Sequence, residues 1–123
     1  KESVSGFSRK ASEDDIKRII NDFTSAAQRC VEAGFDWVEL HCAHGYLISQ
    51  FLSKSINKRK DSWGGDLKGR SRFLLEIFKS IRKHVPEKFI IGIRLSPEIK
   101  GLEISLDASL KLVKKINFWL FKF

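Results

Sequence analysis

The chain has 123 residues, of which 42% are hydrophobic and 31% charged, a balance typical of one globular domain. No apolar stretch approaches the roughly 20 residues of a membrane-spanning helix, and residues 1–6 lack the apolar centre of a signal peptide. The net charge of +8 favours binding to polyanions such as nucleic acids. The basic residues, however, lie in a loop or alternate with apolar residues at helical spacing, as on a solvated surface. At most weak polyanion binding is therefore expected, with no specific nucleic acid and no membrane as partner.

The chain contains two cysteines, Cys30 and Cys42, too few for a disulfide framework. Both lie in segments whose apolar pattern predicts burial, which favours a reducing, cytoplasmic setting. The chain contains no methionine, so we expect the start of the polypeptide to lie elsewhere.

The first predicted element is a helix that begins after Ser12. Residues 1–11 are polar and without period, and we interpret them as the end of a preceding loop. The Ser12 hydroxyl can cap a helix, and the three acids that follow it suit the positive end of the helix dipole. Gly34 stands where a left-handed residue would end the helix. The apolar residues between recur every three or four positions and form one stripe: Ile16, Ile19, Ile20, Phe23, Ala26, Ala27, Cys30 and Val31.

A short buried strand is predicted over residues 36–40, ending near His41, because bulky apolar residues directly follow the helix-stop glycine. Residues 45–52 suit one or two helical turns. Residues 53–66 are polar and contain a double glycine, which predicts a long ordered loop. A loop of this length inside a compact domain is usually functional.

A second helix is predicted over residues 67–84, where Pro86 ends it, and a buried strand over residues 89–95. Arg94 is the one charge in that strand, so it needs a partner or a ligand. Glu39 on the neighbouring strand is one candidate.

A third helix is predicted over residues 105–116. Residues 118–123 are interpreted either as the next strand or as a false C-terminus. The alternating order of helices and strands predicts an α/β fold with a parallel sheet, as one partial domain whose βα units span residues 12–117.

The candidate site is the end of the first strand, where His41, His44 and Tyr46 crowd three proton-handling groups into six residues. His41 alone could be an ordinary strand-end histidine, and Tyr46 could pack with its hydroxyl bonded locally. A zinc site of His41, Cys42 and His44 has suitable ligand types. It lacks a fourth ligand, however, and adjacent strand residues point to opposite faces, so we expect no metal.

Three stretches together resemble the old yellow enzyme family of flavin oxidoreductases. They are residues 33–36 with 38–47; residues 50–53 with Asn57, Arg59, Asp61, Gly64, Gly65, Arg70 and Arg72; and residues 92–97. The resemblance implies a partial (β/α)8 TIM barrel, from the helix before the fourth strand to the fifth helix or sixth strand. Trp63 stands where the family usually has tyrosine.

The resemblance also implies roles for four residues. His41 and His44 would hydrogen-bond the carbonyl oxygen of an α,β-unsaturated substrate, where hydride transfer from reduced FMN places negative charge. Tyr46 would protonate the α-carbon as general acid. Arg94 would lie beside the pyrimidine edge of the FMN ring, and NAD(P)H would be the reductant.

The length of the chain limits these expectations, because a complete barrel needs about 250 residues. The first hypothesis is an FMN-dependent reductase of activated C=C bonds, present as a truncated chain that is inactive alone. The second is a non-enzymatic remnant with a basic surface. A half-barrel also leaves strand edges unpaired, which predicts self-association.

Overall fold

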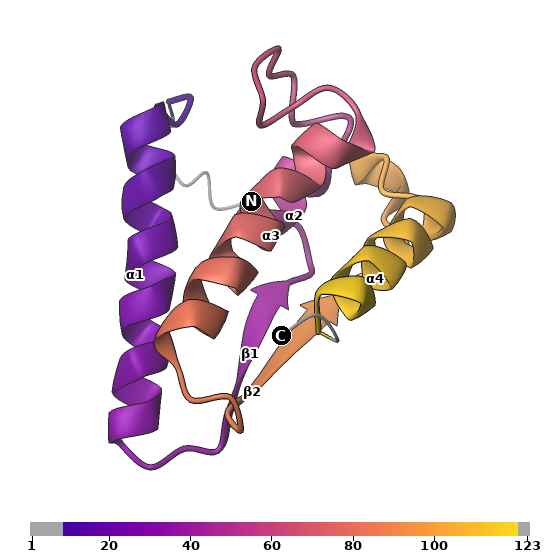
Figure 1. Cartoon of the computed structure of the whole chain (residues 1–123). Helices are drawn as coiled ribbons and strands as arrows, with labels where there is room; N and C mark the ends of the chain where they lie inside the picture. The colour runs from indigo at the N-terminus through magenta and orange to yellow at the C-terminus, as the bar shows by residue number, and fades with distance from the viewer. Residues whose placement is uncertain (1–8, 121–123) are drawn as a thin grey trace, which may run out of the picture.

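The computed structural model describes residues 9–120, with side chains for residues 9–116. Helices and strands follow one another as the sequence predicts (Figure 1). They are α1 (Glu13–Glu32), β1 (Trp37–Cys42), α2 (Leu47–Leu52), α3 (Leu67–His84), β2 (Ile90–Leu95), the short 3-10 helix η1 (Lys100–Leu102) and α4 (Leu106–Leu120).

The limits of α1 are set by local chemistry at both ends. The Ser12 hydroxyl accepts the backbone N–H of Asp15, and the Asp15 carboxylate accepts the backbone N–H of Ser12, which completes a capping box. After the last turn, Gly34 takes a φ of +84°, a conformation that costs glycine little. The predicted cap and helix stop are confirmed.

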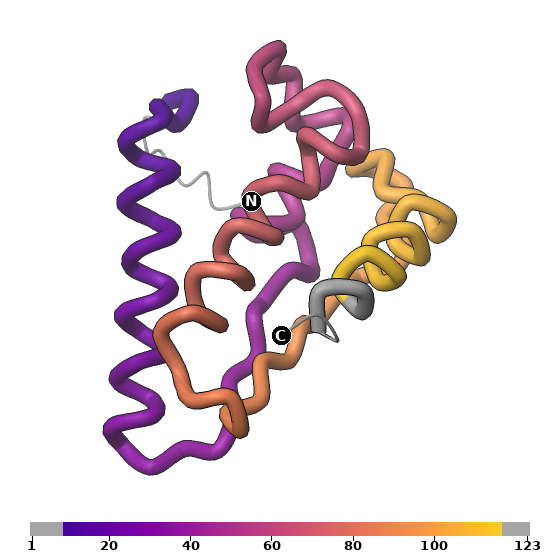
Figure 2. Tube along the Cα trace, viewed as in Figure 1, coloured from indigo at the N-terminus to yellow at the C-terminus, as the bar shows by residue number. Residues whose placement is uncertain are grey.

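β1 and β2 form a parallel pair in which His41 lies opposite Arg94. Figure 2 shows the chain returning from the end of β1 to the start of β2 through the long loop and α3, the crossover that a parallel pair requires. One face of the pair carries buried side chains such as Leu40 and Ile91, which join the core under α1 and α3. The other face, with Glu39, is open.

Helix packing closes the core on the covered face. The buried stripe of α3 includes Phe73, whose ring stacks on that of Phe51 in α2 with centroids 4.2 Å apart. Thr24 of α1 donates a hydrogen bond to the Ser80 hydroxyl of α3 at 2.8 Å. The buried stripe of α3 therefore packs against α1 and α2, and the helix predicted over residues 67–84 is confirmed.

β1 and α4 both extend beyond their predicted ends. β1 continues to Cys42, so His41 belongs to the strand itself. α4 continues through residues 118–120, where a strand was one alternative, because no glycine or proline interrupts the sequence between 105 and 120. Residues 121–123 lie outside the described part of the chain. Among the helices within residues 9–120, none is both long and apolar enough to cross a bilayer.

Candidate active site

The three predicted site residues come together at the carboxyl end of β1. His44 and Gly45 both adopt left-handed backbone conformations, with φ of 58° and 80°, and turn the chain from the strand into α2. The His44 ring lies 5.5 Å from that of His41, and the Tyr46 ring lies 5.0 Å from it, between centroids. Tyr46 is 62% exposed, so its hydroxyl is open to a ligand.

Side chains from three directions hold this turn. The buried Ser49 hydroxyl in α2 donates to the carbonyl oxygen of Cys42 at 2.8 Å. The Ser96 hydroxyl, just after β2, accepts the backbone N–H of His44 at 3.0 Å. The Gln50 amide donates to the Gly45 carbonyl at 3.0 Å. The sequence predicted no role for Ser49 or Ser96. The one available signal was that Ser96, a hydroxyl residue, directly follows a strand.

Arg94 lies on the open face of the sheet beside the histidines. Its Nε donates to the Glu39 carboxylate at 2.6 Å, the alternative partner named from the sequence. The Arg94 side chain remains 58% exposed. The site therefore combines two imidazoles, a phenol and a guanidinium on one open surface.

Cys42 points the other way, into the core, and is 2% exposed. Burial, with a smaller effect of the Glu39 charge, raises the pKa of its thiol to about 12. Because Cys42 lies on the face of β1 opposite to His41, the two side chains cannot share a metal ion. Within the described residues, no group of three or more His, Cys, Asp or Glu side chains is arranged to hold a metal ion.

The long loop after α2 is ordered around Asn57. Its amide donates to the carbonyl oxygens of Phe51 and Trp63 at 2.7 and 2.8 Å, and its oxygen accepts the backbone N–H of Arg59. The Arg59 guanidinium pairs with Asp61 through two bonds of 3.0 and 2.7 Å, and this contact lowers the pKa of that carboxyl. The sequence identified Asn57, Arg59 and Asp61 as positions of the family motif but did not predict these contacts.

Arg59 also ties the loop to the start of α1, because it donates to the carbonyl oxygen of Ala11 at 2.7 Å. The start of α1, the loop and the carboxyl ends of both strands consequently lie at the same end of the molecule (Figure 1). In (β/α) barrels this is the end that carries active sites.

Two arginines of α3 have internal contacts, although the sequence predicted a solvated basic face. Arg70 donates to the carbonyl oxygens of Leu52 at 3.0 Å and Gly65 at 2.5 Å. The Arg72 guanidinium lies 4.7 Å from the ring centroid of the buried Trp63. Both therefore hold the loop against α3, while Arg72 remains exposed, as the predicted solvated face requires.

Parallel strands with covering helices and a side-chain cluster at their carboxyl ends are the arrangement found in part of a (β/α) barrel. The sequence model of the NADH:flavin oxidoreductase / NADH oxidase family matches residues 1–116. The chain belongs to this family, and the suspected relationship to old yellow enzymes is confirmed.

Among its relatives, 12-oxophytodienoate reductase 2 of Arabidopsis thaliana is 48% identical over 90 residues, which are 72% of this chain and 24% of that protein. A 2-naphthoyl-CoA reductase in complex with 2-naphthoyl-CoA superposes with a TM-score of 0.86 at 33% identity, over 89% of this chain and 17% of that one. Morphinone reductase in complex with tetrahydroNAD superposes with a TM-score of 0.76 at 34% identity, over 91% and 31%.

These alignments define the extent of the chain as well as its family. It spans about a quarter of the length of the curated relatives that it matches. The described residues form an open part of a TIM barrel, as predicted.

Proposed function

We propose that this chain carries the substrate-activating segment of an FMN-dependent oxidoreductase of the old yellow enzyme type. The proposed reaction is the NAD(P)H-driven reduction of the C=C bond of an α,β-unsaturated carbonyl compound. The observation that supports it is the grouping of His41, His44 and Tyr46, with ring centroids 5.0 to 5.5 Å apart, at the carboxyl end of β1.

In this proposal the two histidines bind the substrate carbonyl oxygen. When a hydride reaches the β-carbon, negative charge develops on that oxygen, and two donors held in advance stabilise it; loss of one such donor typically costs about 3 kcal/mol of transition-state stabilisation. The Tyr46 hydroxyl donates the proton to the α-carbon. Its 62% exposure leaves it open to a bound substrate.

FMN, when bound, supplies the hydride that it takes from NAD(P)H. Arg94 is the residue of this chain that fits the flavin, because a guanidinium carries five N–H donors and its described contact with Glu39 uses that of Nε. Its position on the open face beside His41 suits a planar ring stacked along the strand ends. The positive charge would favour a reduced, anionic flavin.

We further propose that the isolated chain associates with itself. The open face of the strand pair exposes Trp37 at 54% and Ile90 at 62%, next to Phe35 at 62%. β1 and β2 each have one neighbour in the described sheet, so each has an edge able to pair with another strand. We propose a cytoplasmic location too, consistent with the free thiols of Cys30 and Cys42; fluorescence from a tagged chain outside the cytoplasm would contradict it.

The first test is a visible spectrum of the purified chain mixed with FMN, before and after NADPH. A yellow protein that NADPH bleaches would show that the chain holds flavin by itself. A colourless chain would mean that it needs the rest of a barrel, so the second test supplies one.

The second test replaces the matching 90-residue segment of 12-oxophytodienoate reductase 2 with that of this chain. We expect the chimera to bind FMN and reduce a cyclic enone. Tyr46→Phe should then lower enone reduction by about 10²-fold or more, the usual effect of removing a general acid, while flavin reduction by NADPH stays normal. A flavin-loaded chimera without enone reduction would contradict the proposal and favour a non-enzymatic remnant.

A further inference from the structure

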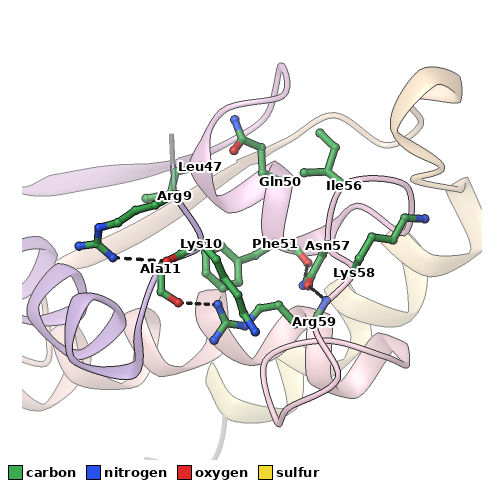
Figure 3. A pocket seen from close by; sticks show the side chains of 10 residues that line it. All are labelled: Arg9, Lys10, Ala11, Leu47, Gln50, Phe51, Ile56, Asn57, Lys58 and Arg59. Carbon is green, nitrogen blue, oxygen red and sulfur yellow. Dashed lines mark hydrogen bonds between the residues drawn. The ribbon is translucent and has the colours of Figure 1, made fainter. Parts of the chain in front are cut away.

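A pocket of about 360 Å³ lies beside α2, next to the cluster of His41, His44 and Tyr46 but lined by other residues (Figure 3). Its wall combines the segment before α1, one side of α2 and the first half of the long loop. Ten residues line it: Arg9, Lys10, Ala11, Leu47, Gln50, Phe51, Ile56, Asn57, Lys58 and Arg59.

The lining combines an apolar wall with positive charge. Leu47, Phe51 and Ile56 present aliphatic and aromatic surface, and Leu47 and Ile56 are 39% and 48% exposed. Every charged residue in the lining is a cation. A purely apolar ligand would make no charged contact with these residues.

Two of the four cations hold the pocket in shape. Arg59 is 11% exposed and bonded to Asp61 and Ala11, so it joins two walls. Arg9 pairs with Asp15 through bonds of 2.5 and 2.8 Å. Their charges are compensated by these carboxylates.

The other two cations can turn toward a guest. The Lys10 ammonium lies 3.9 Å from Asp61, and its side chain is 67% exposed. The Lys58 ammonium donates to a neutral acceptor, the carbonyl oxygen of Lys54, at 3.1 Å. Figure 3 shows Lys58 on the side of the pocket opposite Arg9. Lysine stems are long and flexible, so both ammonium groups can follow an anion without moving the backbone.

We propose that this pocket binds an organic anion, an apolar body that carries one carboxylate or phosphate group. The apolar body would contact Leu47, Phe51 and Ile56, and the anionic group would lie between Lys10 and Lys58. The lower dielectric constant beside the apolar wall would strengthen that charge pairing relative to bulk water.

The pocket adjoins the candidate active site. Leu47 follows Tyr46 directly, and Gln50 both lines the pocket and donates to the Gly45 carbonyl in the histidine turn. The pocket is therefore placed to hold the anionic end of a molecule whose other end reaches the strand ends. Binding itself depends on no flavin chemistry.

Equilibrium dialysis of the full chain without FMN or NAD(P)H tests this inference. The probes are 1-naphthyl phosphate and 1-naphthylacetate, compared with 1-naphthol and inorganic phosphate. We expect one of the two naphthyl anions to bind more tightly than both 1-naphthol and inorganic phosphate. The anion that binds more tightly identifies phosphate or carboxylate as the preferred group. Because the mixture contains no cofactor, failure here is distinct from failure of the proposed reaction.

Matched variants locate the binding. Lys10→Gln combined with Lys58→Gln should weaken the preferred anion by about fivefold or more, the effect of losing charge-assisted contacts. Lys54→Gln combined with Lys60→Gln removes the same charge from exposed lysines of the same loop outside the lining, and should leave the affinity within about twofold. Ile56→Ser should weaken the naphthyl anion and leave inorganic phosphate unchanged.

Three results would overturn the proposal. The first is an equal loss of affinity in the two double lysine variants, which would indicate that the anion is attracted by the net charge of the chain alone. The second is binding of 1-naphthol as tight as that of the anions. The third is binding of the naphthyl anions that Lys10→Gln with Lys58→Gln leaves unchanged, in variants whose circular dichroism matches that of the parent chain.

Discussion

The backbone N–H of His44 donates a hydrogen bond of 3.0 Å to the hydroxyl of Ser96, a residue 52 positions away. His44 has a φ of 58°, a left-handed conformation that a side chain disfavours. The Ser96 contact offsets part of that cost and joins the loop after β1 to the loop after β2. The position of one proposed substrate-binding residue thus depends on the neighbouring strand.

Removal of this acceptor should loosen the turn. We expect Ser96→Ala to lower the free energy of unfolding by about 0.5 to 1 kcal/mol, since the bond is exposed and water can replace the hydroxyl. The amide of His44 should exchange with solvent faster, as measured by hydrogen exchange. Ser62→Ala in the exposed loop is the control, with a change within about 0.5 kcal/mol. Unchanged exchange at His44 would argue against the contact.

The ion pair of Glu39 and Arg94 should be measurable but weak. A double-mutant cycle with Glu39→Ala and Arg94→Ala should give a coupling of about 0.5 to 1 kcal/mol, because the two side chains are 35% and 58% exposed. The reference is the exposed helical pair of Asp107 and Lys111, expected at about 0.3 to 0.5 kcal/mol. Urea melts provide the free energies, and a coupling smaller than that of the reference pair would contradict this expectation.

Asn57 should be the most sensitive residue of the long loop. Asn57→Ala removes two donors from carbonyl oxygens and one acceptor from a backbone N–H, so we expect a loss of about 2 to 3 kcal/mol in thermal or urea melts. Trypsin should cut faster after the basic residues 58–60. Asn21→Ala on the exposed face of α1 is the control, and equal effects of the two variants would contradict the assigned role.

The capping box should contribute to acid sensitivity. Hydrogen bonds from Arg9 and then from Ser12 lower the pKa of Asp15, so its stabilising effect is present above the unfolded value of about 4 and is lost as the pH falls through the folded value. We expect the stability gap between the parent chain and Asp15→Asn to be constant above about pH 5 and to shrink below about pH 4. Asp22→Asn controls for loss of one carboxylate. A stability gap at pH 2 as large as that at pH 7 would contradict this expectation.

The two thiols should differ in reactivity. Cys42 is buried with its pKa raised to about 12, whereas Cys30 is half-buried on α1. A thiol reagent at pH 8 should therefore modify Cys30 in the native chain and reach Cys42 only after unfolding. Labelling of Cys30→Ala and Cys42→Ala separates the two sites. Rapid native labelling of Cys30→Ala would show that Cys42 is accessible.

Sequence reasoning placed the elements well because their signals are local. The Ser12 cap, the apolar stripe of α1 and the glycine stop all act within a few residues, and the structure confirms each. The same holds for the grouping of His41, His44 and Tyr46, which lie within six positions of one another. The end of α4 was less certain, since bulky apolar residues suit a strand and a helix alike.

By itself, then, the sequence determined the βα order, the buried stripe of α1 and the residues proposed for the candidate site. The strands that it predicted as buried are covered on one face only. The tertiary structure decided how those residues are held: the Ser96 acceptor for His44, the Glu39 partner of Arg94 and the contact of Arg59 with Ala11. The paired residues in these contacts lie 52, 55 and 48 positions apart. Local periodicity carries no information over such separations, because which distant groups meet depends on how the strands pair and the loops close.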